Sequence, residues 1–326
     1  MLQSAGNLVK TLEATCIRII WRRCRLLLLF FALLILTDAV FAEGTIIYVV
    51  LPGHLFKTDE SWGKSERIPT EGMNVSQPAF SWDGRKIAFI GSAKGKGQPD
   101  IYWMDSDGQN IELLTDTPMM DLHPQFSPDG KRLIFTRRKA RQKWVTVSLD
   151  LSTQKERILF KGFHATYSPD GKWIAFTADD NGNWEVFKTA ADRFAPINLS
   201  HHRAMDAHPH FSLDGKWIAF SSERHGGPRL LDIYKMRADG SEVTRLTNGL
   251  GAELFEAVWS PSGKQILFFD NLHPRQLYRM DSDGKNLKVV AENAGDPAWF
   301  DPKWARVFAV SAVGRLAQTW GALKQR

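Results

Sequence analysis

Short apolar runs in this chain alternate with polar turns, and inside the runs the buried-type residues recur at every second position. The stretch YSPDGKWIAFT (167–177) shows the pattern: an aromatic residue and a serine, a turn of the Pro-Asp-Gly type, then Ile174 and Phe176 one residue apart. FSPDGKRLIFT (126–136) and FSLDGKWIAFS (211–221) repeat it. A period of two indicates a β-strand, and these turn residues favour a tight reversal. Each stretch therefore predicts a β-hairpin.

The hairpin recurs with a period in the middle forties. Five turn glycines align at intervals of 46, 41, 44 and 48 residues, and a degenerate sixth copy covers residues 299–310. After each hairpin, a third apolar run leads to an Asp-Gly turn, as in DIYWMDSDG (100–108) and DIYKMRADG (232–240), and a fourth run follows. The aligned glycines are Gly84, Gly130, Gly171, Gly215 and Gly263.

Four antiparallel strands in a repeat of about 44 residues are typical of a propeller blade. One such sheet exposes two apolar faces that only neighbouring blades can bury, so copies must continue until the ring closes. The sequence therefore predicts an all-β fold, a six-bladed β-propeller of four-stranded antiparallel blades closed by pairing of N- and C-terminal strands. Residues 44–50 and 307–310 compete for the second-strand position of the closing blade, and the pattern leaves that choice open.

The repeat, written PxFSPDGKxIAFxS followed by DIYxMxxDGxxxxxLT, resembles the WD-like propeller repeat of the TolB family of exported bacterial proteins. The resemblance covers roughly residues 44–311. It implies the propeller fold and says little about function, because one fold hosts many functions.

The first 42 residues differ from the repeats. Basic residues precede the apolar run LLLLFFALLIL (26–36), and Val40 and Ala42 supply the small residues of a cleavage site. We expect a signal peptide over 1–42, a periplasmic or secreted product, and no stable membrane span after cleavage, since the run is short against the roughly 20 residues that cross a bilayer. An uncleaved anchor is the alternative. Residues 43–315 then form the propeller and residues 316–326 a C-terminal tail.

Removal of this leader changes the composition of the working part. Both cysteines, Cys16 and Cys24, lie before the apolar run, so disulfides and thiol chemistry are excluded from the mature chain. The leader also carries half of the net charge of +6. The net charge that remains after removal of the leader is too small to support a nucleic-acid partner. We expect a monomer that binds a protein, an anionic glycan or a peptide.

Histidines at equivalent places in the repeat are the main candidates for chemistry. His123 in DLHPQF and His208 in DAHPHF are predicted just before the innermost strand, with His164 in GFHATY nearby in the repeat frame and His210 two residues after His208. In a propeller this junction lies near the central channel, where residues distant in sequence converge, as a binding pocket or metal site requires. The structural alternative is that the preceding aspartates tie the loop and the histidines are tolerated beside them.

The loops between second and third strands are mostly basic, as in RRKARQK (137–143) and ERHGGPR (223–229). A basic rim attracts an anionic ligand, although lysine and arginine are also the ordinary solubilising residues of exposed loops. Two DSDG stretches (105–108 and 281–284) lack the ligand spacing of a calcium loop and are interpreted as turns. The predicted ligand-binding residues are Asp121, His123, His164, Asp206, His208, His210 and Arg224.

Three functions are compatible with these patterns. The leading hypothesis is a non-enzymatic binding or interaction module that acts through its top face and channel mouth, without catalytic residues, cofactor or metal. An alternative is a metal-dependent polysaccharide lyase or hydrolase, because HPHFSLDG (208–215) resembles the histidine-rich segment of oligogalacturonate lyases. That resemblance implies a divalent transition metal on His164, His208 and His210, with Arg224 neutralising substrate carboxylates. A third hypothesis is an envelope scaffold component that needs other chains.

Overall fold

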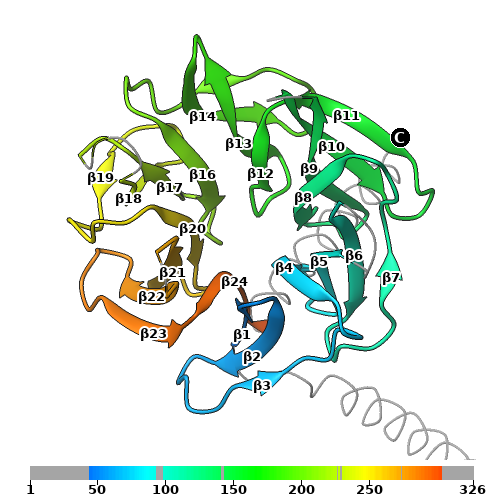
Figure 1. The fold of residues 1–326 in the computed structure, drawn as a ribbon. Coiled ribbons are helices and arrows are strands. Elements are labelled where there is room, and N and C mark those ends of the chain that lie inside the picture. Colours follow the sequence, from blue (N-terminus) through cyan, green and yellow to red (C-terminus); the bar gives the residue numbers. More distant parts are fainter. Residues whose placement is uncertain are drawn as a thin grey trace, which may run out of the picture. The chain divides into compact units, whose positions relative to one another are not determined.

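Six four-stranded antiparallel sheets make up the computed structural model, which describes residues 44–92, 98–140, 143–225, 227, 230–272 and 274–302. The sheets follow one another around a central axis (Figure 1). The predicted leader, the C-terminal tail and the candidate strand at 307–310 lie outside the described residues. Within the described ranges, no helix has the length and apolar character that a membrane crossing demands.

Each blade runs from an innermost strand at the axis to a short or exposed strand at the rim, as the predicted repeat requires. The strands are, blade by blade, β4 (Asn74–Phe80), β5 (Lys86–Ser92), β6 (Asp100–Asp105) and β7 (Glu112–Leu113); β8 (Met120–Phe126), β9 (Arg132–Ala140), β10 (Lys143–Asp150) and β11 (Glu156–Lys161); β12 (Phe163–Tyr167), β13 (Trp173–Asp180), β14 (Asn183–Ala190) and β15 (Ile197–Asn198); β16 (Asp206–Phe211), β17 (Trp217–Ser222), β18 (Asp232–Arg237) and β19 (Thr244–Arg245); β20 (Leu254–Trp259), β21 (Gln265–Asp270), β22 (Gln276–Asp281) and β23 (Lys288–Glu292); and β24 (Ala294–Phe300), β1 (Thr45–Val50), β2 (His54–Asp59) and β3 (Glu66–Arg67).

The predicted hairpin turn is fixed by its serine, aspartate and glycine. In the second blade, the Ser127 hydroxyl donates to Asp129 at 2.6 Å and accepts the backbone N–H of Arg132 at 2.9 Å. Gly130 has φ of 67°, a conformation that glycine adopts without steric cost. The same geometry in the other copies explains why the sequence repeats these residue types. The acidic residues of the DSDG stretches likewise accept local N–H bonds, as at Asp107 and Asp283, which agrees with their interpretation as turns.

The core lies between blades rather than inside any one of them. Each buried cluster joins residues of neighbouring sheets: Ala175 and Val186 of the third blade, for example, pack with Phe211 and Phe220 of the fourth. In five of the six second strands, one phenylalanine is at most 1% exposed, namely Phe89, Phe135, Phe176, Phe220 and Phe268. This confirms that the blades bury one another's apolar faces.

The ring closes by pairing strands from the two ends of the described chain. β1 pairs antiparallel with β24, with Thr45 opposite Phe300 and Val50 opposite Ala294. β24 is therefore the innermost strand of a blade whose other three strands come from the N-terminal side, as predicted. In the described residues, the second-strand position belongs to β1.

The closing strand should contribute to stability as any core strand does. Ile47 of β1 is fully buried in a cluster with Phe89 and Ala298, so Ile47→Ala should lower the free energy of unfolding by about 2–5 kcal/mol. Ile158→Ala is the matched control, because Ile158 is 46% exposed, and it should change stability by less than about 0.5 kcal/mol. Urea denaturation measures both. Equal effects of the two substitutions would contradict the closure described above.

Candidate functional site

Every innermost strand holds one non-glycine residue with positive φ, between 49° and 56°. Each of these residues lies at a register shift between the innermost strand and the next one, which is a β-bulge. Non-glycine residues in this conformation cost free energy and often occur at functional sites. We call the six residues the channel ring: Gln77, His123, His164, His208, Glu256 and Asp296.

Sequence reasoning found half of the channel ring. It predicted His123 and His208 just before the innermost strands and His164 nearby in the repeat frame, whereas the three residues lie inside β8, β16 and β12. The bulge explains the difference, because it turns a residue within the strand toward the axis. Sequence reasoning missed Gln77, Glu256 and Asp296. The position in the repeat could have identified the first two, because Gln77, Glu256 and the three histidines each precede their turn glycine by seven residues.

The channel ring separates two cavities. The first, which we call the hairpin-side cavity, has a volume of about 190 Å³ and lies toward the first turn of each blade; its wall includes Trp82, Pro169, Pro261 and Trp299. The second, the loop-side cavity, lies toward the opposite face and is lined by Asn271 and other residues of the inter-strand loops. All six ring residues line the loop-side cavity, and His123, His164, His208, Glu256 and Gln77 also line the hairpin-side one.

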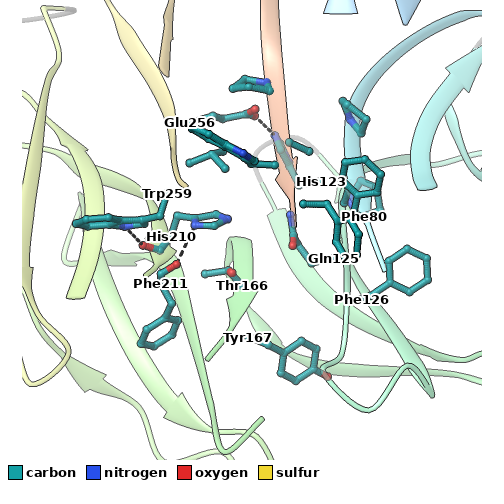
Figure 2. Close-up of a pocket in the computed structure, with 18 of the residues that line it drawn as sticks. Phe80, His123, Gln125, Phe126, Thr166, Tyr167, His210, Phe211, Glu256 and Trp259 are labelled. Atoms are coloured by element: carbon teal, nitrogen blue, oxygen red, sulfur yellow. Dashed lines mark hydrogen bonds and ion pairs between the residues drawn. The ribbon is translucent and has the colours of Figure 1, made fainter. Parts of the chain in front are cut away.

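Three ring side chains converge on one atom, Nε2 of His123. His164 Nε2 is 2.5 Å away, the Gln77 amide nitrogen is 2.7 Å away and Glu256 Oε1 is 3.8 Å away. Figure 2 shows Glu256 and His123 pointing toward one another across the channel. The His208 ring lies against His164, with ring centroids 4.0 Å apart. The remaining ring nitrogen, Nδ1, of all three histidines is buried without a hydrogen-bond partner in the described structure.

Backbone N–H groups of the channel ring bind the preceding blade. Gln77 N–H donates to Asp296 Oδ2 at 3.2 Å, and His123 N–H donates to Gln77 Oε1 at 2.9 Å. His164 N–H donates to the Thr136 hydroxyl and His208 N–H to that of Thr177, both at 3.2 Å. These bonds hold the bulged residues in position and join consecutive blades around the axis.

Burial disfavours the charged forms of the ionisable ring side chains. It lowers the pKa of His123 and His164 well below the ordinary value, helped by the neighbouring histidines, and lowers that of His208 to about 3. Burial, with the charge of Asp296 nearby, raises the pKa of Glu256 well above its ordinary value. Burial also raises the pKa of Asp296, which Arg275 opposes from 4.0 Å. Neutral imidazoles are available as lone-pair donors at neutral pH.

The histidine at the next level of the channel is His210. It lines the hairpin-side cavity together with Gln125 and Thr166 (Figure 2), and its Nδ1 lies 3.0 Å from the carbonyl oxygen of Phe211. Trp259 Nε1–H donates to the His210 carbonyl at 3.2 Å, which seals the junction between two blades. Burial lowers the pKa of His210 to about 4. His210 therefore shares the channel with the ring but contacts other partners.

The three other predicted residues lie in buried ion pairs. Asp121 accepts two hydrogen bonds from Arg137, both at 2.7 Å, and Asp206 accepts bonds from Arg224 at 2.8 and 3.3 Å. Both aspartates are fully buried. Among the described residues that line the two cavities, Asp121, Asp206 and Arg224 do not occur. Their contacts match the structural alternative, in which the aspartate ties the loop.

Comparison with known proteins agrees with this architecture. Residues 149–307 match the family model of the TolB beta propeller domain. The crystal structure of TolB from Acinetobacter baumannii superposes with a TM-score of 0.68 at 24% identity, over 78% of this chain and 66% of that one. This likeness concerns the fold. The predicted resemblance to TolB-like propellers is confirmed.

Sequence relatives match parts of the chain. An uncharacterized protein of Agrobacterium fabrum is 28% identical over 225 residues, which are 64% of this chain and 59% of the relative. The Tol-Pal system protein TolB of Anaeromyxobacter dehalogenans is 33% identical over 118 residues, 36% of this chain and 27% of the relative. The chain thus spans well under two thirds of the curated relatives it matches.

The buried ion pairs should matter for stability. Asp206→Asn leaves the Arg224 guanidinium, whose side chain is 12% exposed, without its counter-charge, so the free energy of unfolding should fall by about 3 kcal/mol. Asp283→Asn removes a carboxylate that is 52% exposed and should cost at most about 0.5 kcal/mol. Chemical denaturation of both variants measures the difference. A neutral Asp206→Asn would show that the pair does not hold this loop.

Buried histidines should also make stability depend on pH. The pKa of His210 is about 4 in the folded chain against an ordinary 6.5, so between these values the unfolded chain binds more protons and the free energy of unfolding falls as pH falls. His210→Gln should reduce this slope by up to about 1.4 kcal/mol per pH unit. Glu256 acts with the opposite sign, because its raised pKa favours the folded chain below that pKa. Urea denaturation at several pH values tests the slope, with exposed His201→Gln as control; an unchanged slope in His210→Gln would contradict the assignment.

Proposed function

We propose that this TolB-like propeller is an exported, non-enzymatic binding module that takes a segment of a protein partner into the mouth of its central channel. The observation that carries the proposal is the hairpin-side cavity, an apolar recess of about 190 Å³ whose inner end is formed by polar ring side chains. Concave sites with apolar walls and a few convergent polar groups are typical of ligand binding.

The wall of this cavity suits an extended peptide. Prolines and aromatic residues alternate around it, since the innermost strands contribute pairs such as Pro78 with Phe80, Pro209 with Phe211 and Pro297 with Trp299. Rigid side chains of this kind lose little conformational entropy when they contact a partner. At the inner end, Gln125, Thr166 and His210 offer hydrogen bonds to a peptide backbone (Figure 2). An apolar segment with a polar tip therefore fits the cavity.

Export and an envelope role are part of the same proposal. The basic and apolar leader of residues 1–42 supports export to the periplasm or beyond. One relative is named a Tol-Pal system protein, which supports an interaction role within an assembly of envelope proteins. An envelope scaffold is then a special case of the binding module, in which the captured segment belongs to a stable partner.

An anionic ligand has weaker support from the described loops. The basic side chains of Arg137 and Arg224 are engaged in ion pairs with buried aspartates, and Arg275 reaches the loop-side cavity close to Asp296. A uronate lyase that uses His164, His208 and His210 is the enzymatic alternative. His164 and His208 lie together, whereas His210 lies at the next level with a different partner. Incubation with oligogalacturonates tests this alternative, which predicts unsaturated products that absorb in the near ultraviolet.

The cavity can be blocked without altering the blade core. Gln125→Trp places an indole in the hairpin-side cavity, and Gln109→Trp places the same side chain on an exposed turn. An envelope protein captured by the native chain should be retained by Gln109→Trp and should bind Gln125→Trp at least about 10-fold more weakly, a loss of about 1.4 kcal/mol. Pull-down followed by titration of the purified partner measures this. Equal binding by both variants would place the partner elsewhere and refute the proposal.

A further inference from the structure

The contacts around His123 Nε2 do not satisfy ordinary hydrogen bonding. A neutral imidazole nitrogen has either one lone pair or one N–H. The Gln77 carbonyl oxygen accepts the His123 backbone N–H, so the amide that faces His123 Nε2 at 2.7 Å is the donor end. That bond takes the single lone pair, while His164 Nε2 lies 2.5 Å from the same atom. Two groups thus compete for one lone pair at a partly buried atom, where an unmade hydrogen bond costs free energy.

A cation relieves the close contact between the two imidazoles, because it accepts one lone pair from each; the Gln77 amide then gives up its hydrogen bond to His123 Nε2. The candidate ligand atoms of His123, His164 and Glu256 all lie within 4.8 Å of one another. A tetrahedral zinc ion with bonds of about 2.0–2.2 Å holds its ligand atoms roughly 3.4 Å apart. The observed separations of 2.5 and 3.8 Å lie on either side of that value, so small side-chain rotations would bring the three atoms to one ion.

We propose that His123, His164 and Glu256 form a binding site for a divalent transition metal ion at the level of the channel ring, and that zinc is the ion that fits best. The His208 ring lies against that of His164 and lines the same cavity, so it is the histidine next to the proposed site. Two imidazoles and one carboxylate are a donor set that suits zinc, whereas calcium requires six to eight oxygen ligands. This inference stands on the ring side chains alone and does not depend on the proposed partner binding.

The local charges and the backbone support such a site. Glu256 and Asp296 place two carboxyl groups at the level of the ring, and in their ionised forms they would offset the charge of a divalent ion. The ligands come from three different blades and lie at bulges, and the backbone N–H groups of His123 and His164 are tied to the preceding blade. A site built on a rigid sheet keeps its ligands in position before the ion arrives.

The test measures metal binding by the full-length protein. After chelator treatment and dialysis, isothermal titration with zinc chloride should show one ion per chain, and calcium chloride should show none at this site. Glu256→Gln, His123→Gln and His164→Gln should each weaken zinc binding by at least about 100-fold, since even loss of a partner behind a ligand costs 10–100-fold. The matched control is Glu253→Gln, three residues away in the chain and outside both cavities, which should bind zinc as the native chain does.

Two further measurements keep the outcome decisive. Circular dichroism shows whether each variant is folded, and visible absorption of a cobalt(II)-loaded chain reports coordination directly, so the folded Glu256→Gln variant should show an altered spectrum. Absence of stoichiometric zinc binding by the native chain would overturn the proposal, as would native affinity in all three ligand variants. Loss of binding in His210→Gln with retention in Glu256→Gln would overturn this ligand set in favour of the one that includes His208 and His210.

Discussion

A four-stranded sheet with two apolar faces cannot shield both of them alone, and this constraint governs the whole molecule. In the fourth blade, for example, Ile218 and Phe220 pack against the third blade, and the opposite face of the sheet packs against the fifth blade. Stacking in a line would leave two faces in water, whereas a ring leaves none. In the closing blade, the innermost position is occupied by β24, which pairs with β1. This blade is therefore built from both ends of the described chain. The central channel is a by-product of that closure.

Repetition then turns a small backbone irregularity into a site. A single bulge in one strand would aim one side chain at the axis, but the same bulge in six innermost strands aims six side chains at one level. The six side chains are three imidazoles, two carboxyl groups and one amide. Two of them, Gln77 and Asp296, also accept backbone N–H bonds from the next blade, so the ring contributes to the scaffold as well as to the candidate chemistry.

The fold could be predicted from the sequence because its determinants are local and repeated. The spacing of Gly130 and its equivalents predicted the repeating blades, and the alternation of apolar residues at Ile174 and Phe176 predicted the strands. Half of the site followed from histidine, an unusual residue type. Gln77 and Glu256 could not be recognised by type, since neither residue favours positive φ and only the frame of the repeat marks them. The ion-pair partner of Asp121 could not be predicted from the sequence, because it depends on the strand register, which places Arg137 directly opposite Asp121.

The register of the closing pair has a mechanical meaning. Thr45, where the first described strand begins, lies opposite Phe300, where the last described strand ends, so these two strand ends form one residue pair of the ladder. A force that pulls these two strand ends apart would act first on the hydrogen bonds of this pair. It would then break the remaining hydrogen bonds between β1 and β24 one after another. The other residue pairs would not resist the force at the same time, because they do so only when the strands are pulled along their length. A pull applied at these two ends would therefore act first on the pairing of β1 with β24, the pair that closes the ring.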